Sequence, residues 1–249
     1  EAGACVFYVD HHFPGDIPAH TNLTAIINES ADVCTAALVN GHLNGAHLDW
    51  AVTGAFGDNL HATARALAKG LDISEQDLTA LENLGTYINY NGYGPAIDDL
   101  HFDPRELYLR LYAAEGPLDF VHNSPDFEKL STGYREDMAR AEALQPLHAR
   151  PGSAVFLLPD EAWARRVSGV YSNDLATHNP ARAHAVLTLN AKGNYLVSVR
   201  APMENKQGAA ELCMQFATGG GRAGAAGIND LPLDQLQSFV DAFEQTYKG

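Results

Sequence analysis

The sequence predicts an α/β protein of two domains, the first built on a parallel sheet and the second smaller, joined by a helical linker. An apolar, β-rich run at residues 5–9 is followed by segments with helical periodicity, and strand and helix patterns alternate again after residue 150. The chain of 249 residues is also long enough for two hydrophobic cores. We place the first domain at residues 1–125, the linker at 126–150 and the second domain at 151–249.

The first domain begins with strands and continues with helices. Residues 5–9 (CVFYV) form a continuous apolar run, typical of a strand buried on both faces of a parallel sheet, and residues 25–27 predict a short second strand. Apolar residues at helical spacing predict core-facing helices at 32–43 and 50–56. Ser74 begins a further helix, because Ser-Glu-Gln-Asp resembles a capping box and leucines follow at helical spacing.

Polar segments precede the second domain. Residues 87–104 are rich in Asn, Gly and Asp and predict a long loop or a broken helix end, which in compact domains often carries function. Residues 126–148 predict a charged connecting helix that ends before the turn signal Arg150-Pro151-Gly152. The chain therefore divides near residues 125–150.

The second domain repeats the α/β pattern. Its predicted elements are a strand at 154–158, a helix that Asp160 caps and that runs to about residue 175, strands at 185–189 and 195–199 joined by a hairpin-like connection, a glycine-rich loop (GGGRAGAAG), and a final helix from Leu233.

The composition limits which classes of binding partner and which cellular compartment we expect. The net charge is −15, from 31 acidic and 16 basic residues, which counts against binding long DNA or RNA but leaves room for a small anion held by a local patch. No apolar run approaches the roughly 20 residues of a membrane span, so we expect no membrane partner. The cysteines at positions 5, 34 and 213 are odd in number and far apart, which favours buried thiols and a cytoplasmic location.

Asp10, His11 and His12 form the first group of candidate functional residues. They follow the first strand directly, and Phe13-Pro14-Gly15 ends it, at the carboxyl edge where open α/β sheets bind ligands. Imidazole and carboxylate groups suit Zn²⁺, Mn²⁺ or Fe²⁺, and Asp10 could instead orient a histidine. An exposed loop that contains these residues by chance is the competing interpretation.

Asp58 is the next candidate ligand. It ends an apolar stretch (GAFGDN) where an unpaired carboxylate would be costly, and a metal would compensate its charge. A helix cap or a surface turn at this position explains the residue equally simply.

Arginine and glycine form the second group. The run Gly219, Gly220, Gly221, Arg222 lets backbone amides approach an anion, and Arg222 offers a planar fork for phosphate oxygens. Arg200 ends the strand YLVSVR and could supply a second cation. A tightly packed turn, with both arginines in ion pairs with nearby acids, is the alternative.

Taken together, FYVDHH, GAFGDN, SVRAP and FATGGGRAGAAGI resemble, in this order, the motifs of the Asp-His-His (DHH) phosphoesterase family with its associated C-terminal domain. The resemblance implies a catalytic domain on a parallel sheet, of which this chain holds the C-terminal portion, and a smaller substrate-binding domain. It implies His11 and Asp58 as metal ligands, His12 as a ligand or a contact to the scissile phosphate, and Asp10 as the residue that orients them. Ser198, Arg200, Gly219 to Gly221 and Arg222 would contact the substrate phosphate.

The resemblance also implies a pair of Mn²⁺ ions, with Mg²⁺ or Co²⁺ as alternatives. The Asp-x-Asp motif of the family normally lies well ahead of Asp-His-His, and only nine residues precede Asp10 here. We therefore expect the other metal ligands ahead of Glu1 or on another polypeptide, or else a degenerate site. The family's glycine loop usually ends in His, whereas Arg222 follows here and favours binding over proton transfer.

Three functions follow as hypotheses. The first is a metal-dependent phosphoesterase that acts on a small nucleotide, a cyclic dinucleotide or a short oligonucleotide, with a homodimer as one assembly. The second is a non-catalytic phosphate- or nucleotide-binding module, or an inactive fragment of such an enzyme. The third is a mononuclear metallohydrolase that uses His11, His12 and Asp58, which would leave Arg200 and the glycines unexplained.

Overall fold

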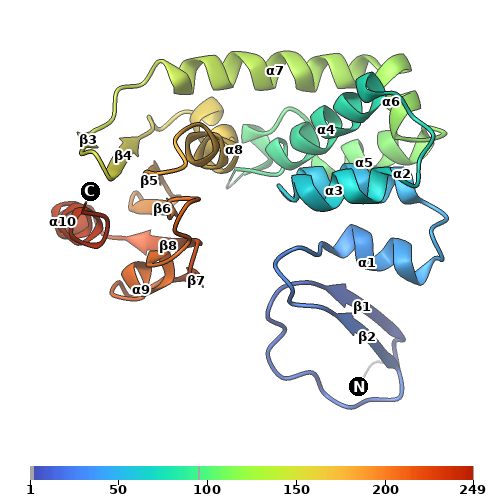
Figure 1. Ribbon diagram of the computed structural model, residues 1–249, viewed down its shortest axis with the longest axis horizontal. Coiled ribbons are helices and arrows are strands. Elements are labelled where there is room, and N and C mark those ends of the chain that lie inside the picture. Colours follow the sequence, from blue (N-terminus) through green and yellow to red (C-terminus); the bar gives the residue numbers. More distant parts are fainter. Residues whose placement is uncertain (1–2, 95, 249) are drawn as a thin grey trace. The chain divides into compact units, whose positions relative to one another are not determined.

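The computed structural model describes residues 3–94 and 96–248 and confirms a mixed α/β fold with helices throughout (Figure 1). The chain forms two compact units, residues 1–89 with 105–131 and residues 90–104 with 132–249. The sequence-based boundary placed residues 90–104 in the first domain. In the structure they belong to the second unit, because Asp99 bonds to Arg165 and Arg166 of that unit.

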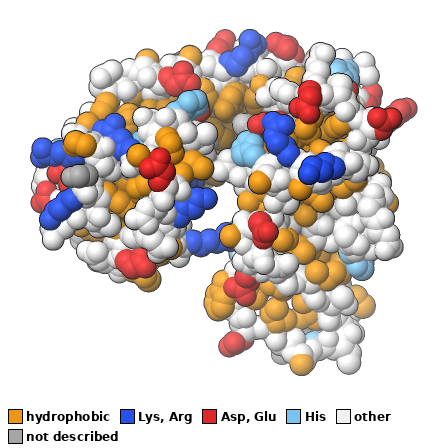
Figure 2. Space-filling view, in the orientation of Figure 1, with side chains coloured by type: hydrophobic (Ala, Val, Ile, Leu, Met, Phe, Trp, Pro, Cys, Tyr) orange, Lys and Arg blue, Asp and Glu red, His pale blue; other side chains and the backbone are white. Residues whose placement is uncertain are grey.

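The first unit starts with two parallel strands, β1 (Val6–Asp10) and β2 (Leu23–Ile27), which pair from Val6 opposite Leu23 to Asp10 opposite Ile27. Parallel pairing was predicted. The expectation that the first strand is buried on both faces was wrong, because Val6 and Phe7 are about half exposed. Among the described residues β1 pairs with β2 alone, and Figure 2 shows hydrophobic side chains reaching the surface over these strands.

The prediction of buried cysteines also needs correction. Cys34 and Cys213 are buried, whereas Cys5 is exposed because it directly precedes this open strand. All three thiols are free.

Helices form the rest of the first unit: α1 (Thr35–His42), α2 (Leu48–Gly57), α3 (His61–Ala68), α4 (Glu75–Tyr90), α5 (Pro104–Ala113), α6 (Pro117–Asn123) and the start of α7 (Pro125–Glu142). Val52 and Phe56 of α2 pack with Ala64 of α3 and Leu81 of α4 in one buried cluster. The predicted cap of α4 is present, because Ser74 Oγ accepts the Asp77 N–H at 3.1 Å. The core therefore fixes α2, whose C-terminal end carries Asp58.

The second unit is built on a six-stranded sheet in the order β3-β4-β5-β6-β8-β7. Its strands are β3 (His148–Ala149), β4 (Ser153–Leu157), β5 (Ala183–Leu189), β6 (Tyr195–Arg200), β7 (Gly219–Arg222) and β8 (Ala225–Leu231). Only β4 and β5 pair in parallel, and the other neighbours are antiparallel. The strands at 154–158, 185–189 and 195–199 were predicted.

Alternating side chains divide this sheet into two buried faces. Ala185, Leu187 and Val199 pack with α9 (Ala209–Cys213) and α10 (Leu236–Thr246), which buries Phe239 and Phe243. Val186 packs with α8 (Ala162–His178) on the other face. Short 3₁₀ turns lie at Ile97–Asp99 and Leu233–Gln235.

Two local predictions in this unit were wrong. The glycine-rich stretch is not a loop but the hairpin β7–β8, because its first strand pairs fully with Ala225 to Ile228. Asp160 does not cap α8, since the residue at the N-cap is Glu161 and the Asp160 carboxylate forms an ion pair with Arg165 instead. In addition, α7 ends at Glu142, before the short strand β3.

Within the described ranges, none of the helices has both the length and the apolar character that crossing a membrane requires.

Candidate functional site

Asp10 draws the residues that follow β1 into a tight turn. One of its carboxylate oxygens, Oδ1, accepts the backbone N–H of His11 at 2.7 Å and of His12 at 3.2 Å, and lies 2.9 Å from His12 Nδ1. The Tyr8 hydroxyl donates to Oδ2 at 2.8 Å. The bond with His12, followed by that from Tyr8, lowers the pKa of the Asp10 carboxyl. These bonds fix the Asp10 carboxylate against the backbone and the ring of His12.

His11 meets Asp58 across the first unit. His11 is buried, with 7% of its surface exposed, and its Nε2 lies 3.5 Å from Asp58 Oδ2 at the C-terminal end of α2. The rings of His11 and His12 lie 4.2 Å apart, and His12 is exposed. The structure thus brings together the four residues predicted from separate motifs, and Asp58 is both a helix cap and a neighbour of His11.

The donor set fits a divalent cation. Asp10, His11 and His12 each offer one ligand atom, and these atoms lie within 4.8 Å of one another. His11 Nδ1 is buried and has no hydrogen-bond partner among the described residues. Two imidazoles with carboxylates are a typical ligand set for Mn²⁺, Zn²⁺ or Fe²⁺. His11 and Asp58 would hold such an ion, with His12 and Asp10 beside it.

In the second unit, strand register places two arginines on one face of the sheet. Arg200 of β6 lies opposite Ala225 of β8, and Ala225 lies opposite Arg222 of β7. Directly opposed residues share a face, so both arginine side chains project from the same side, two strand spacings or roughly 10 Å apart at their backbones. The small Ala225 between them leaves this part of the face open.

The neighbouring row extends this open face. Ser198 lies opposite Gly227, and Gly227 lies opposite Gly220. A Cβ added at Gly220 would meet no atom within 4 Å. We call Gly220, Ala225 and Gly227 the glycine floor. It has almost no side chains of its own and is bordered by Ser198, Arg200 and Arg222.

Gly219 and Gly221 do not belong to this face. A Cβ at Gly219 would lie 1.7 Å from the carbonyl oxygen of Cys213, so this glycine permits β7 to pack against α9. Gly221 has a φ of 141°, a backbone conformation that favours glycine. Of the predicted phosphate contacts, Ser198, Arg200, Gly220 and Arg222 therefore lie on one face, while Gly219 and Gly221 serve the packing of the strand.

The two arginines carry uncompensated charge. Arg200 donates to Asn173 Oδ1, to Ser198 Oγ and to the carbonyl of Val199, and burial lowers its pKa. Arg222 is exposed. Neither arginine forms an ion pair with any acid in the described part of the chain, so the ion-pair alternative is wrong there. Unpaired cations in so acidic a protein favour an external anion.

His184 is a polar residue that the sequence-based interpretation missed. It lies opposite Arg200 in the sheet and is 1% exposed, and its Nδ1 has no hydrogen-bond partner among the residues described. Burial and then the charge of Arg182 lower its pKa to about 4. A lone histidine within the apolar run AHAVLTL was the available signal.

This shift predicts a pH-dependent stability. Between pH 6.5, the ordinary pKa of histidine, and about pH 4, His184 is protonated in the unfolded state but neutral in the folded state. The unfolded state therefore binds more protons, and the free energy of unfolding falls as the pH falls through this range. We expect wild type to lose about 2 kcal/mol of unfolding free energy from pH 7 to pH 5 through this group. Urea unfolding at both pH values should show this loss reduced in His184→Gln. His178→Gln, the same change at an exposed histidine, should show the full wild-type loss. If the free energy of unfolding falls equally with pH in wild type and both variants, His184 is not the group responsible.

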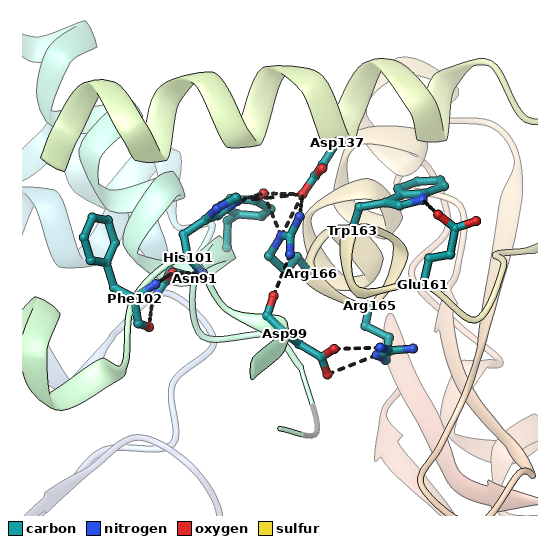
Figure 3. Close-up of polar contacts among 10 residues, drawn as sticks. Asn91, Asp99, His101, Phe102, Asp137, Glu161, Trp163, Arg165 and Arg166 are labelled. Carbon is teal, nitrogen blue, oxygen red and sulfur yellow. Dashed lines mark hydrogen bonds and ion pairs between the residues drawn. The ribbon is translucent and has the colours of Figure 1, made fainter. Parts of the chain in front are cut away.

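A second missed feature is a polar cluster that ties the segment with Asp99 and His101 to α7 and α8 (Figure 3). Arg166 donates to Asp137 Oδ2 at 2.7 to 2.8 Å and to the Asp99 carbonyl at 2.6 Å, while Arg165 binds both Asp99 carboxylate oxygens. The Tyr90 hydroxyl donates to Asp137 and lies 2.7 Å from His101 Nε2. These charges are mutually satisfied, so the cluster is structural, and its members are too far apart in sequence to form a local pattern.

Comparison with known proteins shows a shared fold. No family model and no curated protein matches the chain. Solved structures do match, and two of them each have a TM-score of 0.55 over 96% of this chain. The pGpG-specific phosphodiesterase PggH from Vibrio cholerae is 14% identical with 82% of its chain covered, and exonuclease RecJ bound to manganese is 16% identical with 68% covered. This likeness shows that the chain shares the fold of these two proteins.

Proposed function

We propose that the protein is a metal-dependent phosphoesterase that hydrolyses a small nucleotide, a cyclic dinucleotide or a short oligonucleotide. The observation that carries the proposal is buried His11 beside Asp58, with Asp10 and His12 at the same strand end. The fold shared with a phosphodiesterase and an exonuclease supports a phosphodiesterase- or nuclease-like activity. RecJ was solved with manganese, which supports Mn²⁺ as the ion, and we expect two ions.

In this proposal each residue has a separate role. When bound, the metal supplies positive charge and an activated water at the phosphorus. His11 and Asp58 hold the metal. Asp10 accepts the Nδ1–H of His12, which fixes its tautomer and leaves the lone pair of Nε2 to serve as a further metal ligand.

The second unit supplies substrate binding. Arg200, Arg222 and Ser198 border the glycine floor, where a terminal phosphate can interact with unpaired guanidinium groups while the attached nucleoside lies on the bare surface. The net charge of −15 disfavours long duplexes, so small or short substrates are preferred.

Hydrolysis of a 5′-phosphorylated dinucleotide tests the proposal. With Mn²⁺ we expect release of nucleoside monophosphate, measured by chromatography, and complete loss of release when EDTA removes the metal. A long DNA duplex of equal nucleotide concentration is the control and should remain intact. Absence of release with Mn²⁺, Mg²⁺ and Co²⁺ would contradict the catalytic assignment.

A non-catalytic phosphate-binding module is the second candidate, favoured by the two unpaired arginines. It predicts binding of the phosphorylated dinucleotide in EDTA, loss of binding in Arg200→Ala, and no hydrolysis with any metal.

A further inference from the structure

Arg200 is held so that part of its guanidinium stays available. Its Nε donates to Asn173 Oδ1 at 2.9 Å, and Nη1 donates to Ser198 Oγ at 2.9 Å and to the Val199 carbonyl at 3.2 Å. The third nitrogen, Nη2, makes no hydrogen bond to a described residue and is not among the buried, unpartnered atoms. Its N–H groups are therefore free to meet solvent or a ligand.

The residue that holds Nε is neutral. A carboxylate at this position would bind the guanidinium more strongly but would cancel its charge. Asp174, the next residue on α8, instead forms an ion pair with His178 at 3.1 Å. The helix thus presents an amide to Arg200, although 31 acidic residues are spread along the sequence.

We propose that Asn173 is a positioning residue that fixes Arg200 in the sheet while keeping its charge and Nη2 for an anion. The ligand is the terminal phosphate of a short nucleotide, an identity that rests on the function proposed above. Asn173 touches Arg200 rather than substrate, and its effect is on the affinity for phosphorylated ligands.

Replacement of Asn173 by aspartate separates positioning from a structural role. Asn173→Asp keeps the size of the side chain and its hydrogen bond to Arg200 Nε. If Asn173 only anchors α8, this change should leave ligand binding unaltered. If Asn173 preserves the charge of Arg200, the change should weaken binding, because the new carboxylate competes with the ligand for the guanidinium group. We expect about 10-fold or greater loss of affinity, as for a hydrogen bond to a charged group, with an unchanged or higher melting temperature.

Calorimetry in EDTA measures this with two probes, a 5′-phosphorylated dinucleotide and the same dinucleotide without the phosphate. Asn173→Asp and Asn173→Ala should both lower the affinity for the phosphorylated dinucleotide and leave the affinity for the unphosphorylated one unchanged. Gln237→Ala, which removes an exposed amide on α10, should bind both probes like wild type. In turnover with Mn²⁺, Asn173→Asp should raise KM and leave kcat unchanged.

Wild-type affinity in Asn173→Asp, or equal affinity of the wild type for both probes, would overturn the inference. Failure of the catalytic proposal looks different, because phosphate-dependent binding in EDTA would persist without any hydrolysis in Mn²⁺.

Discussion

Replacing His11 with alanine is expected to lower Mn²⁺-dependent hydrolysis by more than about 100-fold, because loss of even an outer partner of a metal ligand costs about 10- to 100-fold. His11 is the buried member of the group, and its Nε2 lies 3.5 Å from Asp58 Oδ2. Steady-state release of nucleoside monophosphate measures the effect. Metal analysis of the purified variant should show fewer bound ions than wild type.

His47→Ala is the matched control, since this histidine is exposed and lies at the start of α2 in the same unit. Its activity should match wild type, and circular dichroism should show both variants folded. Undiminished hydrolysis by folded His11→Ala would remove His11 from the site and, with it, the main support for the proposed function.

Replacing Gly219 with alanine is expected to destabilise the second unit by about 3 kcal/mol, the upper end of typical overpacking costs. The new Cβ would lie 1.7 Å from the Cys213 carbonyl oxygen, and a backbone atom of α9 has no rotamer by which to move away. Gly220→Ala, one residue along the strand, adds the same methyl group in open space and should change stability by less than about 0.5 kcal/mol.

The two tryptophans allow each unit to be followed separately, because Trp50 lies in the first unit and Trp163 in the second. Urea unfolding in a Trp50→Phe background reports the second unit alone. Equal midpoints for the Gly219 and Gly220 variants would show that close packing does not explain Gly219. Gly220→Ala should nevertheless lower the affinity for the phosphorylated dinucleotide, because the added methyl group projects from the glycine floor.

Local sequence patterns predicted where strands and helices form better than they predicted how these elements are buried and paired. The run before Asp10 predicted a strand of a parallel sheet, but burial depends on what covers the strand, and among the described residues Val6 and Phe7 remain half exposed. The glycines at 219–221 were assigned to a loop because glycine weakens strands. Pairing with β8 and close packing on α9 outweigh that preference.

The residues of the candidate site that belong to sequence motifs were predicted, and those outside the motifs were not. The order of motifs predicted that His11 and Asp58 meet, and the structure places them in contact range. Asn173 and His184 were missed, because their roles arise from strand register and helix packing rather than from neighbouring residues.

The polar cluster around Arg166 also has a consequence for the order of folding. Several of its bonds join residues 47 to 76 positions apart, and such distant partners can meet only after the intervening chain has condensed. We therefore expect residues 97–103 to dock late, once α8 has formed on the sheet, and to be among the first to detach. The amide protons of His101 and Phe102, both bonded to Asn91 Oδ1, should report this opening by exchanging with solvent before those of β5.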